Sequence, residues 1–418
     1  MAASGAFPYV FGTAGNHEFS PVNAVPPLAL KNSAAQWVYD TLSSAWTQWI
    51  GASASGSTVK STGAYSVQYA SSKLRIISLN TNLYYIQNYW LYETTMETDP
   101  SGQWAWLVTE LDAAEKSGER VWIIGHMPMG LSDAFHAGSN YFDQIVNRYS
   151  ATIAAMFFGT YPSSLSPSTA LFFSYNVHWR SGSHTQSWPT TNLLSTPGHT
   201  HMDHFQISYS SYTARSYTDA KVASYIAPSL TPTSGHPTFR VYTVDPVTFG
   251  VLDSTTYMAD MTNAAFQTTG PVWTPYYSAK AAYGPLVSPP LSADDPAAEL
   301  TAAFWHNVTA ALAADPAAFD QYYARKSRGW DVQPCAGACA ALEVCGLQAA
   351  RAQDNCVVPT PGVNFSKRSE QPLHAHRDEC GLSVSRSAIA SLIVRRDVLE
   401  YLEDRLEEEK TRRRSVTA

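Results

Sequence analysis

Several features that decide a protein's class are scarce in this sequence of 418 residues. Charged residues make up only 15 % of the chain and the formal net charge is -7, so nothing in its charge favours nucleic acid as a partner. The sequence contains no apolar run long enough to span a bilayer. Its first residues lack a basic segment followed by an apolar one, so we expect no signal peptide. What remains is a chain with 45 % apolar residues, which is sufficient for one large domain with appendages or for two domains.

Cysteine is also rare, and four of the five cysteines lie close together: Cys335, Cys339, Cys345 and Cys356. Such clustering is typical of a tail closed by disulfides in a secreted protein. A zinc knuckle is the alternative, although the intervening segments of three, five and ten residues do not match paired CxxC hooks. Cys380 is left over. Glycosylation sequons at Asn307 and Asn364 agree with a secretory protein.

The apolar periodicity predicts strands that alternate with helices. Helices are expected at 36–50 and 103–116, and the chain turns helical again at 293–323. A last helix at 387–413 carries many charges, which favours an exposed or loosely docked helix over a specific coiled coil. Buried strands are expected at 74–79, 121–124 and 153–158, with a further alternating strand at 239–243. This order predicts an α/β sandwich with its functional residues in the loops beyond the strand ends.

Three short motifs carry the chemistry. They are Gly15-Asn16-His17-Glu18, Gly125-His126-Met127-Pro128, and Gly198-His199-Thr200-His201-Met202-Asp203. Imidazole and amide or carboxylate oxygens suit zinc and its neighbours, and two such ions about 3.5–4 Å apart can generate hydroxide and bind phosphoryl oxygens. We interpret the glycine before each motif as a point where the backbone turns sharply at a strand end.

These motifs resemble the last three motifs of the calcineurin-like metallophosphoesterases. The sequence around and between them resembles the acid sphingomyelinase branch. The segments that carry this resemblance are GNHEFSPVNAVPP, LRIISLNTN, TDPSGQWAWLVTELDAAEKSGERVWIIGHMPMG and the cysteine-bearing tail. The resemblance implies that Asn16, His126 and His199 bind one Zn²⁺ and that His201 binds a second. It implies that His17 contacts the phosphate or protonates the leaving alkoxide. It also implies Cys335–Cys339 and Cys345–Cys356 disulfides.

The resemblance further implies a metallophosphoesterase β-sandwich flanked by helices. We expect this domain over residues 1–290, a helical region with two disulfides over 291–357, and a linker with a charged helix over 358–418. The implied function is two-metal hydrolysis of a phosphodiester, with sphingomyelin cleaved to ceramide and phosphocholine, by a secreted or vacuolar/lysosomal glycoprotein. The expected partner is a phosphodiester substrate, with membrane sphingolipid as one candidate, and the expected state is a monomer.

Two departures from the family pattern qualify that expectation. The family's opening Asp-x-His and Gly-Asp motifs should precede the Gly15-Asn16-His17-Glu18 motif, but the fourteen residues before it contain neither Asp nor His. The sequence therefore predicts a fold that is truncated at its N-terminus. Two alternatives to the sphingomyelinase function follow: a catalytically inactive fragment and a nucleotide phosphodiesterase.

The second departure is a Ser/Thr/Pro-rich segment at 160–198 that lacks convincing periodicity. Its removal would join Phe157-Phe158-Gly159 to His199-Thr200-His201 and give the continuous family text FFGHTHMDHF. The segment can be encoded with a splice donor at Gly159-Thr160-Tyr161, a branch site and an acceptor. A retained intron is one hypothesis, and a genuine loop beside the active site is the other.

Overall fold

The computed structural model describes residues 10–26, 35–69, 72–92, 99–159, 191–195, 199–232 and 235–356. All of them fall in one compact unit, Met1–Pro359. The predicted helix at 387–413, the sequon at Asn364 and Cys380 lie outside the described residues. Among the described helices, none combines the length and the apolar character that a membrane span requires.

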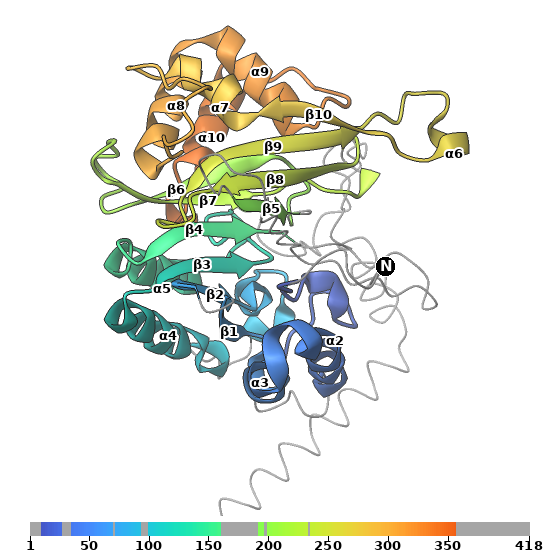
Figure 1. The fold of residues 1–418 in the computed structure, drawn as a ribbon, viewed down its shortest axis with the longest axis vertical. Helices are drawn as coiled ribbons and strands as arrows, with labels where there is room; N and C mark the ends of the chain where they lie inside the picture. The colour runs from blue at the N-terminus through green and yellow to red at the C-terminus, as the bar shows by residue number, and fades with distance from the viewer. Residues whose placement is uncertain are drawn as a thin grey trace, which may run out of the picture. The chain divides into compact units, whose positions relative to one another are not determined.

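The larger sheet has six strands in the order β1-β2-β3-β4-β7-β6 (Figure 1). The four central strands β2, β3, β4 and β7 run parallel, whereas β1 and β6 pair antiparallel at the edges. The strands are β1 (Tyr65–Gln68), β2 (Leu74–Ser78), β3 (Arg120–Gly125), β4 (Ile153–Phe158), β6 (His204–Tyr209) and β7 (Ala220–Ile226). The strands predicted at 74–79, 121–124 and 153–158 are confirmed. Because the central strands are parallel, the loops that follow them emerge at one edge of the sheet.

A second, antiparallel sheet has the order β10-β9-β8-β5. Its strands are β5 (Thr191–Ser195), β8 (Thr238–Val244), β9 (Val251–Ala259) and β10 (Trp273–Ser278). Strand β8 confirms the prediction at 239–243. Strand β5 was not predicted; it belongs to the 160–198 segment, of which the structure describes only residues 191–195.

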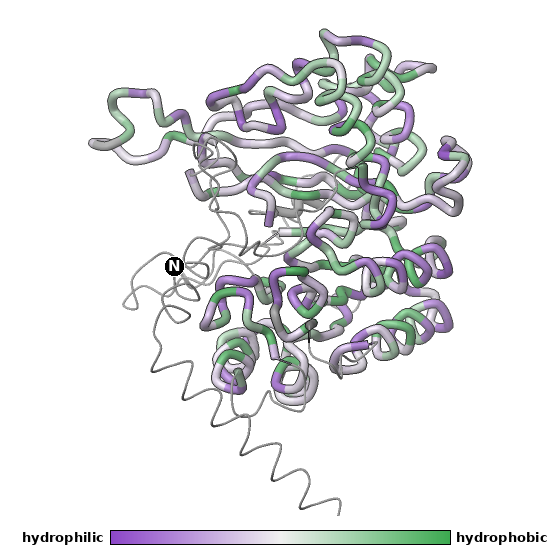
Figure 2. The backbone as a smooth tube through the Cα atoms, turned by 180° about the vertical axis from the view of Figure 1, so that it is seen from behind, coloured by the Kyte–Doolittle hydropathy of each residue, from purple (hydrophilic) through white to green (hydrophobic). Residues whose placement is uncertain are grey.

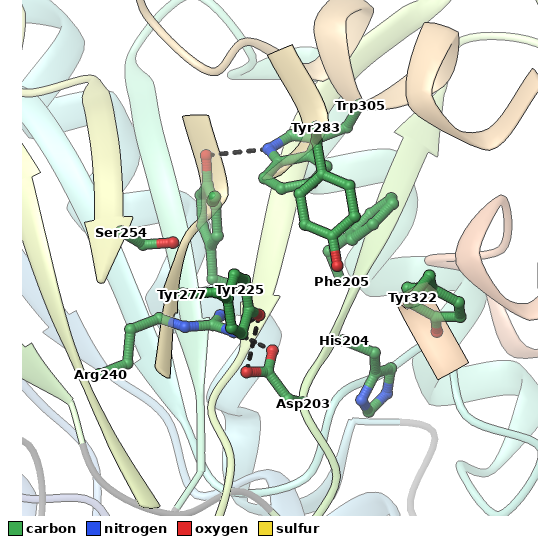
Figure 3. Close-up of a pocket in the computed structure, with 11 residues that line it drawn as sticks. Asp203, His204, Phe205, Tyr225, Arg240, Ser254, Tyr277, Tyr283, Trp305 and Tyr322 are labelled. Carbon is green, nitrogen blue, oxygen red and sulfur yellow. Dashed lines mark hydrogen bonds and ion pairs between the residues drawn. The ribbon is translucent and has the colours of Figure 1, made fainter. Parts of the chain in front are cut away.

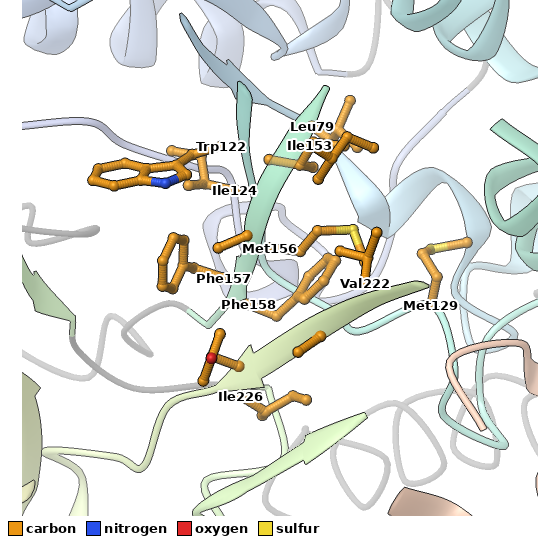
Figure 4. Close-up of a cluster of buried hydrophobic side chains, with 14 of the residues drawn as sticks. Leu79, Trp122, Ile124, Met129, Ile153, Met156, Phe157, Phe158, Val222 and Ile226 are labelled. Atoms are coloured by element: carbon orange, nitrogen blue, oxygen red, sulfur yellow. The ribbon is translucent and has the colours of Figure 1, made fainter. Parts of the chain in front are cut away.

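The two sheets pack face to face through aromatic side chains. Tyr242 of β8 contacts Phe157 of β4 and Tyr225 of β7, with ring centroids 4.9 and 5.4 Å apart. The indole of Trp122 donates a hydrogen bond to the Phe249 carbonyl at 2.8 Å. Phe158, which follows Phe157 and therefore points to the opposite face, contacts Phe142 of helix α5 (His136–Arg148) instead. Figure 4 shows Phe157 and Phe158 among the buried side chains of this core.

Nine α-helices are described, and α4 and α5 cover the outer face of the larger sheet (Figure 1). Hydrophobic and hydrophilic residues alternate along both of these helices, as an amphipathic cover requires (Figure 2). The helices are α2 (Gln36–Ala54), α3 (Lys60–Thr62), α4 (Gln103–Ser117), α5 (His136–Arg148), α6 (Phe266–Thr269), α7 (Ala279–Tyr283), α8 (Ala302–Ala314), α9 (Pro316–Lys326) and α10 (Ala338–Leu347). Helices α2 and α4 confirm the predictions at 36–50 and 103–116.

The predicted helical stretch at 293–323 was wrong at its start, because the first helix there begins at Ala302. The Leu300 amide instead donates to the Val251 carbonyl at 2.7 Å, which joins this segment to β9. Thr301 then caps α8, since its hydroxyl accepts a hydrogen bond from the Phe304 amide at 3.1 Å. A continuous helix from residue 293 would break both interactions.

The disulfides Cys335–Cys339 and Cys345–Cys356 are both present, as predicted. The second one closes a segment that lies against the loop after β3. There the Asn355 side chain donates to the Gly130 carbonyl at 2.9 Å, and the Ala352 amide donates to the Ser139 hydroxyl at 2.8 Å. The disulfide-bearing region therefore supports the loop that begins with the Gly125-His126 motif.

Candidate metal centre

The candidate ligands meet at the carboxyl edge of the parallel strands. His126 directly follows β3, and the amide of Gly159, directly after β4, donates to the Gly125 carbonyl at 2.8 Å. Asn16 begins the short 3₁₀ helix η1 (Asn16–Glu18). The segment before it is tied to the 3₁₀ helix that follows β2, η3 (Thr81–Tyr84), because the Asn82 side chain donates to the Ala14 carbonyl at 2.7 Å. Three distant parts of the sequence are thus brought to one edge.

The interpretation of the glycines as sharp turns was wrong at the two positions that the structure describes. Gly15 has φ -94° and ψ 173°, which any residue can adopt. Gly125 is favoured by close packing instead, since a Cβ there would lie 3.0 Å from the Thr81 methyl group and 3.1 Å from the Phe158 ring. Gly198 lies outside the described residues.

The side chains of Asn16, His126 and His199 converge on one point. His126 Nε2 lies 2.7 Å from Asn16 Oδ1 and 3.2 Å from His199 Nδ1. Ligand atoms around a tetrahedral zinc ion with bonds of about 2.0–2.1 Å are separated by roughly 3.3 Å. The separation of His126 Nε2 from His199 Nδ1 matches this value, and Asn16 Oδ1 would have to move outward by about 0.6 Å to reach it. Amide oxygen and imidazole nitrogen are also donors that zinc accepts.

His126 is suited to metal binding by its protonation state. Burial lowers the pKa of His126 well below its usual value, and the nearby charges of His199, His17 and His201 lower it further. A histidine ligand must be neutral, so this shift favours the binding form. His17 directly follows Asn16 and His201 lies two residues after His199, so both are close neighbours of residues that contact His126. All five residues proposed from the motifs are therefore gathered in one region.

The backbone at His201 has an unusual conformation, with φ at +58°. The side chain of His201 is 5 % exposed. A positive φ is uncommon for histidine and is found most often where a turn is held by its surroundings. Among the described residues, no three His, Cys, Asp or Glu side chains form a complete metal-binding group, and the convergent set includes an asparagine.

Three neighbours of the ligands were missed by sequence reasoning. Asn23 Oδ1 accepts a hydrogen bond from Asn16 Nδ2 at 2.7 Å, and Asp133 Oδ2 lies 3.2 Å from His199 Nε2. Burial raises the pKa of the Glu18 carboxyl to about 7. Asn23 and Glu18 lie within or beside the first motif and could have been suspected from that position. Asp133 lies in a loop without periodicity and carried no signal.

Asp203, the last residue of the third motif, contacts side chains of the second sheet. Its carboxylate pairs with Arg240, and it accepts hydrogen bonds from Tyr277 at 2.8 Å and Thr256 at 3.2 Å. Asp203, Arg240 and Tyr277 line a cavity of about 10 Å³ (Figure 3). That volume holds about one water molecule and cannot admit a phosphodiester. The cavity is consequently not a substrate pocket, and the contacts of Asp203 tie the third motif to the second sheet.

The sequon residue Asn307 is half-buried within helix α8. Its partner Thr309 is fully buried, donates to the His306 carbonyl at 2.7 Å and accepts from the Gln348 side chain at 2.6 Å. Glycosylation at Asn307 stays a prediction.

The sequence is similar to characterised phosphodiesterases. It is 31 % identical over 350 residues to the human protein named sphingomyelin phosphodiesterase, covering 82 % of this chain and 46 % of that one. It is 27 % identical over 354 residues to sphingomyelin phosphodiesterase 1 of Caenorhabditis elegans, covering 84 % and 52 %. It is 27 % identical over 355 residues to the rat cyclic GMP-AMP phosphodiesterase SMPDL3A, covering 81 % and 65 %. The chain thus spans about half the length of the sphingomyelin phosphodiesterases it matches. No family model matches it.

Proposed function

Since this chain is an acid sphingomyelinase-like protein, we propose that it is a metal-dependent phosphoric diester hydrolase. The observation that carries the proposal is the convergence of Asn16 Oδ1 and His199 Nδ1 on His126 Nε2. These three atoms come from separate parts of the chain, and no hydrophobic packing requirement would bring them together. A site built for a divalent cation accounts for their arrangement.

Asn16, His126 and His199 would hold one zinc ion, and His201 would contribute to a second. When bound, the metal supplies a hydroxide nucleophile and positive charge for the phosphoryl oxygens. His17 acts on the leaving group. Its ring N–H donates a hydrogen bond to the phosphate, and its proton passes to the leaving alkoxide oxygen as the bond from phosphorus to that oxygen breaks.

The fold that best accommodates this site is the metallophosphoesterase β-sandwich, with the two packed sheets and the ligands at the carboxyl edge of β3 and β4. We place the protein in a secreted or vacuolar/lysosomal compartment, as a monomeric glycoprotein. Both disulfides agree with an oxidising compartment.

Two substrate classes follow from the relatives. The substrate we favour is sphingomyelin, cleaved to ceramide and phosphocholine, because several relatives carry that activity in their names. A nucleotide phosphodiester is the second candidate, because the rat relative is named a cyclic GMP-AMP phosphodiesterase.

Metal content and turnover test the proposal together. Zinc per chain is measured by mass spectrometry after dialysis, and hydrolysis is followed with sphingomyelin vesicles and with a nucleotide diester. We expect bound zinc and turnover of one substrate class, and we expect His199→Ala to lose both. His136→Ala, at an exposed histidine of α5, is the matched control and should retain both. A wild-type protein without zinc and without turnover would refute the proposed function and favour an inactive fragment.

A further inference from the structure

We propose that Asp133 is a positioning residue that fixes the ring orientation and tautomer of His199. The inference rests on the proposed function, because it concerns a ligand of the same centre. Asp133 lies outside all three motifs, in the loop between β3 and α5. Its effect is exerted through His199, the candidate ligand that its carboxylate contacts.

The chemistry of the two groups determines the tautomer. His199 Nε2 lies 3.2 Å from Asp133 Oδ2, and His199 Nδ1 faces His126 Nε2 at the same distance. An ionised carboxylate can only accept a hydrogen bond, so in a neutral ring the proton must be on Nε2. The lone pair is then on Nδ1, which is the atom directed at the convergence point. Carboxylates that orient metal-binding histidines in this way raise the basicity of the ligand.

The loop that carries Asp133 is held against a neighbouring segment. The Asp133 carbonyl accepts from the Ile86 amide at 2.9 Å, and the Phe135 amide donates to the Tyr84 carbonyl at 2.7 Å. Tyr85, between those two partners, packs edge-on against the His199 ring with centroids 4.9 Å apart. His199 is therefore confined by the carboxylate at one edge and by Tyr85 at its side.

The Asp133 side chain also carries an unsatisfied atom. Its Oδ1 is buried and has no hydrogen-bond partner among the described residues, while the side chain as a whole is 29 % exposed. A buried oxygen left without a partner is destabilising, and a functional role is one explanation for keeping it.

Two measurements on the full chain test the inference. The first is ¹⁵N NMR of the histidine rings in the metal-free protein, where we expect wild-type His199 as the Nε2–H tautomer. Asp133→Ala should populate the Nδ1–H form as well. Asp133→Asn, whose amide oxygen can still accept, should retain the wild-type tautomer.

The second measurement is zinc affinity by competition with a chromophoric chelator at constant pH. We expect Asp133→Ala to weaken binding about 10–100-fold and Asp133→Asn to weaken it less, because a neutral acceptor replaces the charged one. Asp320→Asn, at an exposed position of α9, is the matched control and should bind as the wild type does. The melting temperature of the metal-free protein separates loss of the ligand orientation from loss of the fold, and it should be unchanged in Asp133→Asn.

The outcomes distinguish this inference from the function on which it rests. A wild-type protein that binds no zinc refutes the proposed function, whereas the tautomer is still read in the metal-free protein. An Asp133→Ala variant with the wild-type tautomer, or with zinc affinity within about two-fold of wild type, overturns the role of Asp133. Equal losses in Asp133→Ala and Asp320→Asn would overturn it as well.

Discussion

The buried pair of Asp203 and Arg240 gives a prediction that links the fold to the candidate centre. Asp203 is 4 % exposed and lies two residues after His201, and Arg240 of β8 is also 4 % exposed. The pair joins the third motif to the second sheet. In Asp203→Ala the arginine would be left buried without a counter-charge.

The expected magnitude follows from that burial. Removing one partner of a buried ion pair lowers the free energy of unfolding by about 3–5 kcal/mol. The remaining neighbours of Arg240 offer only neutral hydroxyls, with Tyr277 at 3.1 Å, Thr256 at 3.3 Å and Tyr242 at 3.4 Å. For a folded unit of roughly 300 residues the entropy of unfolding near 60 °C is about 0.6 kcal/mol/K, so the melting temperature should fall by about 5–8 °C.

Calorimetry of the wild type and of two variants provides the assay. Asp203→Ala should show the fall in melting temperature, and the double variant Asp203→Ala/Arg240→Met should recover most of it, because both charges are then removed. The reasoning is refuted by an Asp203→Ala variant within about 1 kcal/mol of the wild type. A double variant no more stable than Asp203→Ala would contradict it equally.

Two further predictions concern pH and the segment at 160–198. Asp143 is 4 % exposed, and burial raises the pKa of its carboxyl from 3.8 to about 6. The contribution of this carboxyl to the free energy of unfolding should therefore be complete below about pH 4 and lost as the pH rises through 6. The loss is at most about 3 kcal/mol. The free energy of unfolding, measured by urea denaturation, should fall between pH 4 and 6 in the wild type and fall less in Asp143→Asn. If the two proteins lose the same free energy over this range, the raised pKa of Asp143 is contradicted. Deletion of 160–198 should leave zinc content unchanged, because the Asn16, His126 and His199 ligands lie outside it; a deletion variant that folds but binds no zinc would show that the segment is a working part of the centre.

Much of the fold could be predicted where one physical signal dominates. The strand at 153–158 is apolar at nearly every position because it is buried on both faces, by Tyr242 through Phe157 and by α5 through Phe158. The start of α8 could not be predicted in the same way. There a hydrogen bond from the Leu300 amide to the Val251 carbonyl of β9 overrides the helical propensity of an alanine-rich stretch. Tertiary contacts of that kind leave no local pattern.

The candidate ligands could be predicted because their residue types are demanded by metal chemistry. The sequence indicates that Gly125, next to His126, is significant, but it does not show why glycine is favoured there. The close approach of Thr81 depends on how two neighbouring strands end side by side. Strand β5 was missed because five residues within an irregular segment give too short a pattern, and its pairing with β8 is a long-range interaction.

The residues that orient the ligands are harder to recognise than the ligands because their role depends on position more than on residue type. Asn23 shows this clearly. Its Oδ1 accepts from Asn16 Nδ2, so Asn16 must turn its own Oδ1 toward His126, and Asn23 Nδ2 in turn donates to Gln87 at 3.1 Å. The backbone of Asn23 has φ at +70°, a conformation that asparagine tolerates better than most residues. An asparagine in a proline-rich loop would suggest only a turn. Asn23 is part of the candidate centre because of the direction of its hydrogen bonds, and the sequence alone does not give that direction.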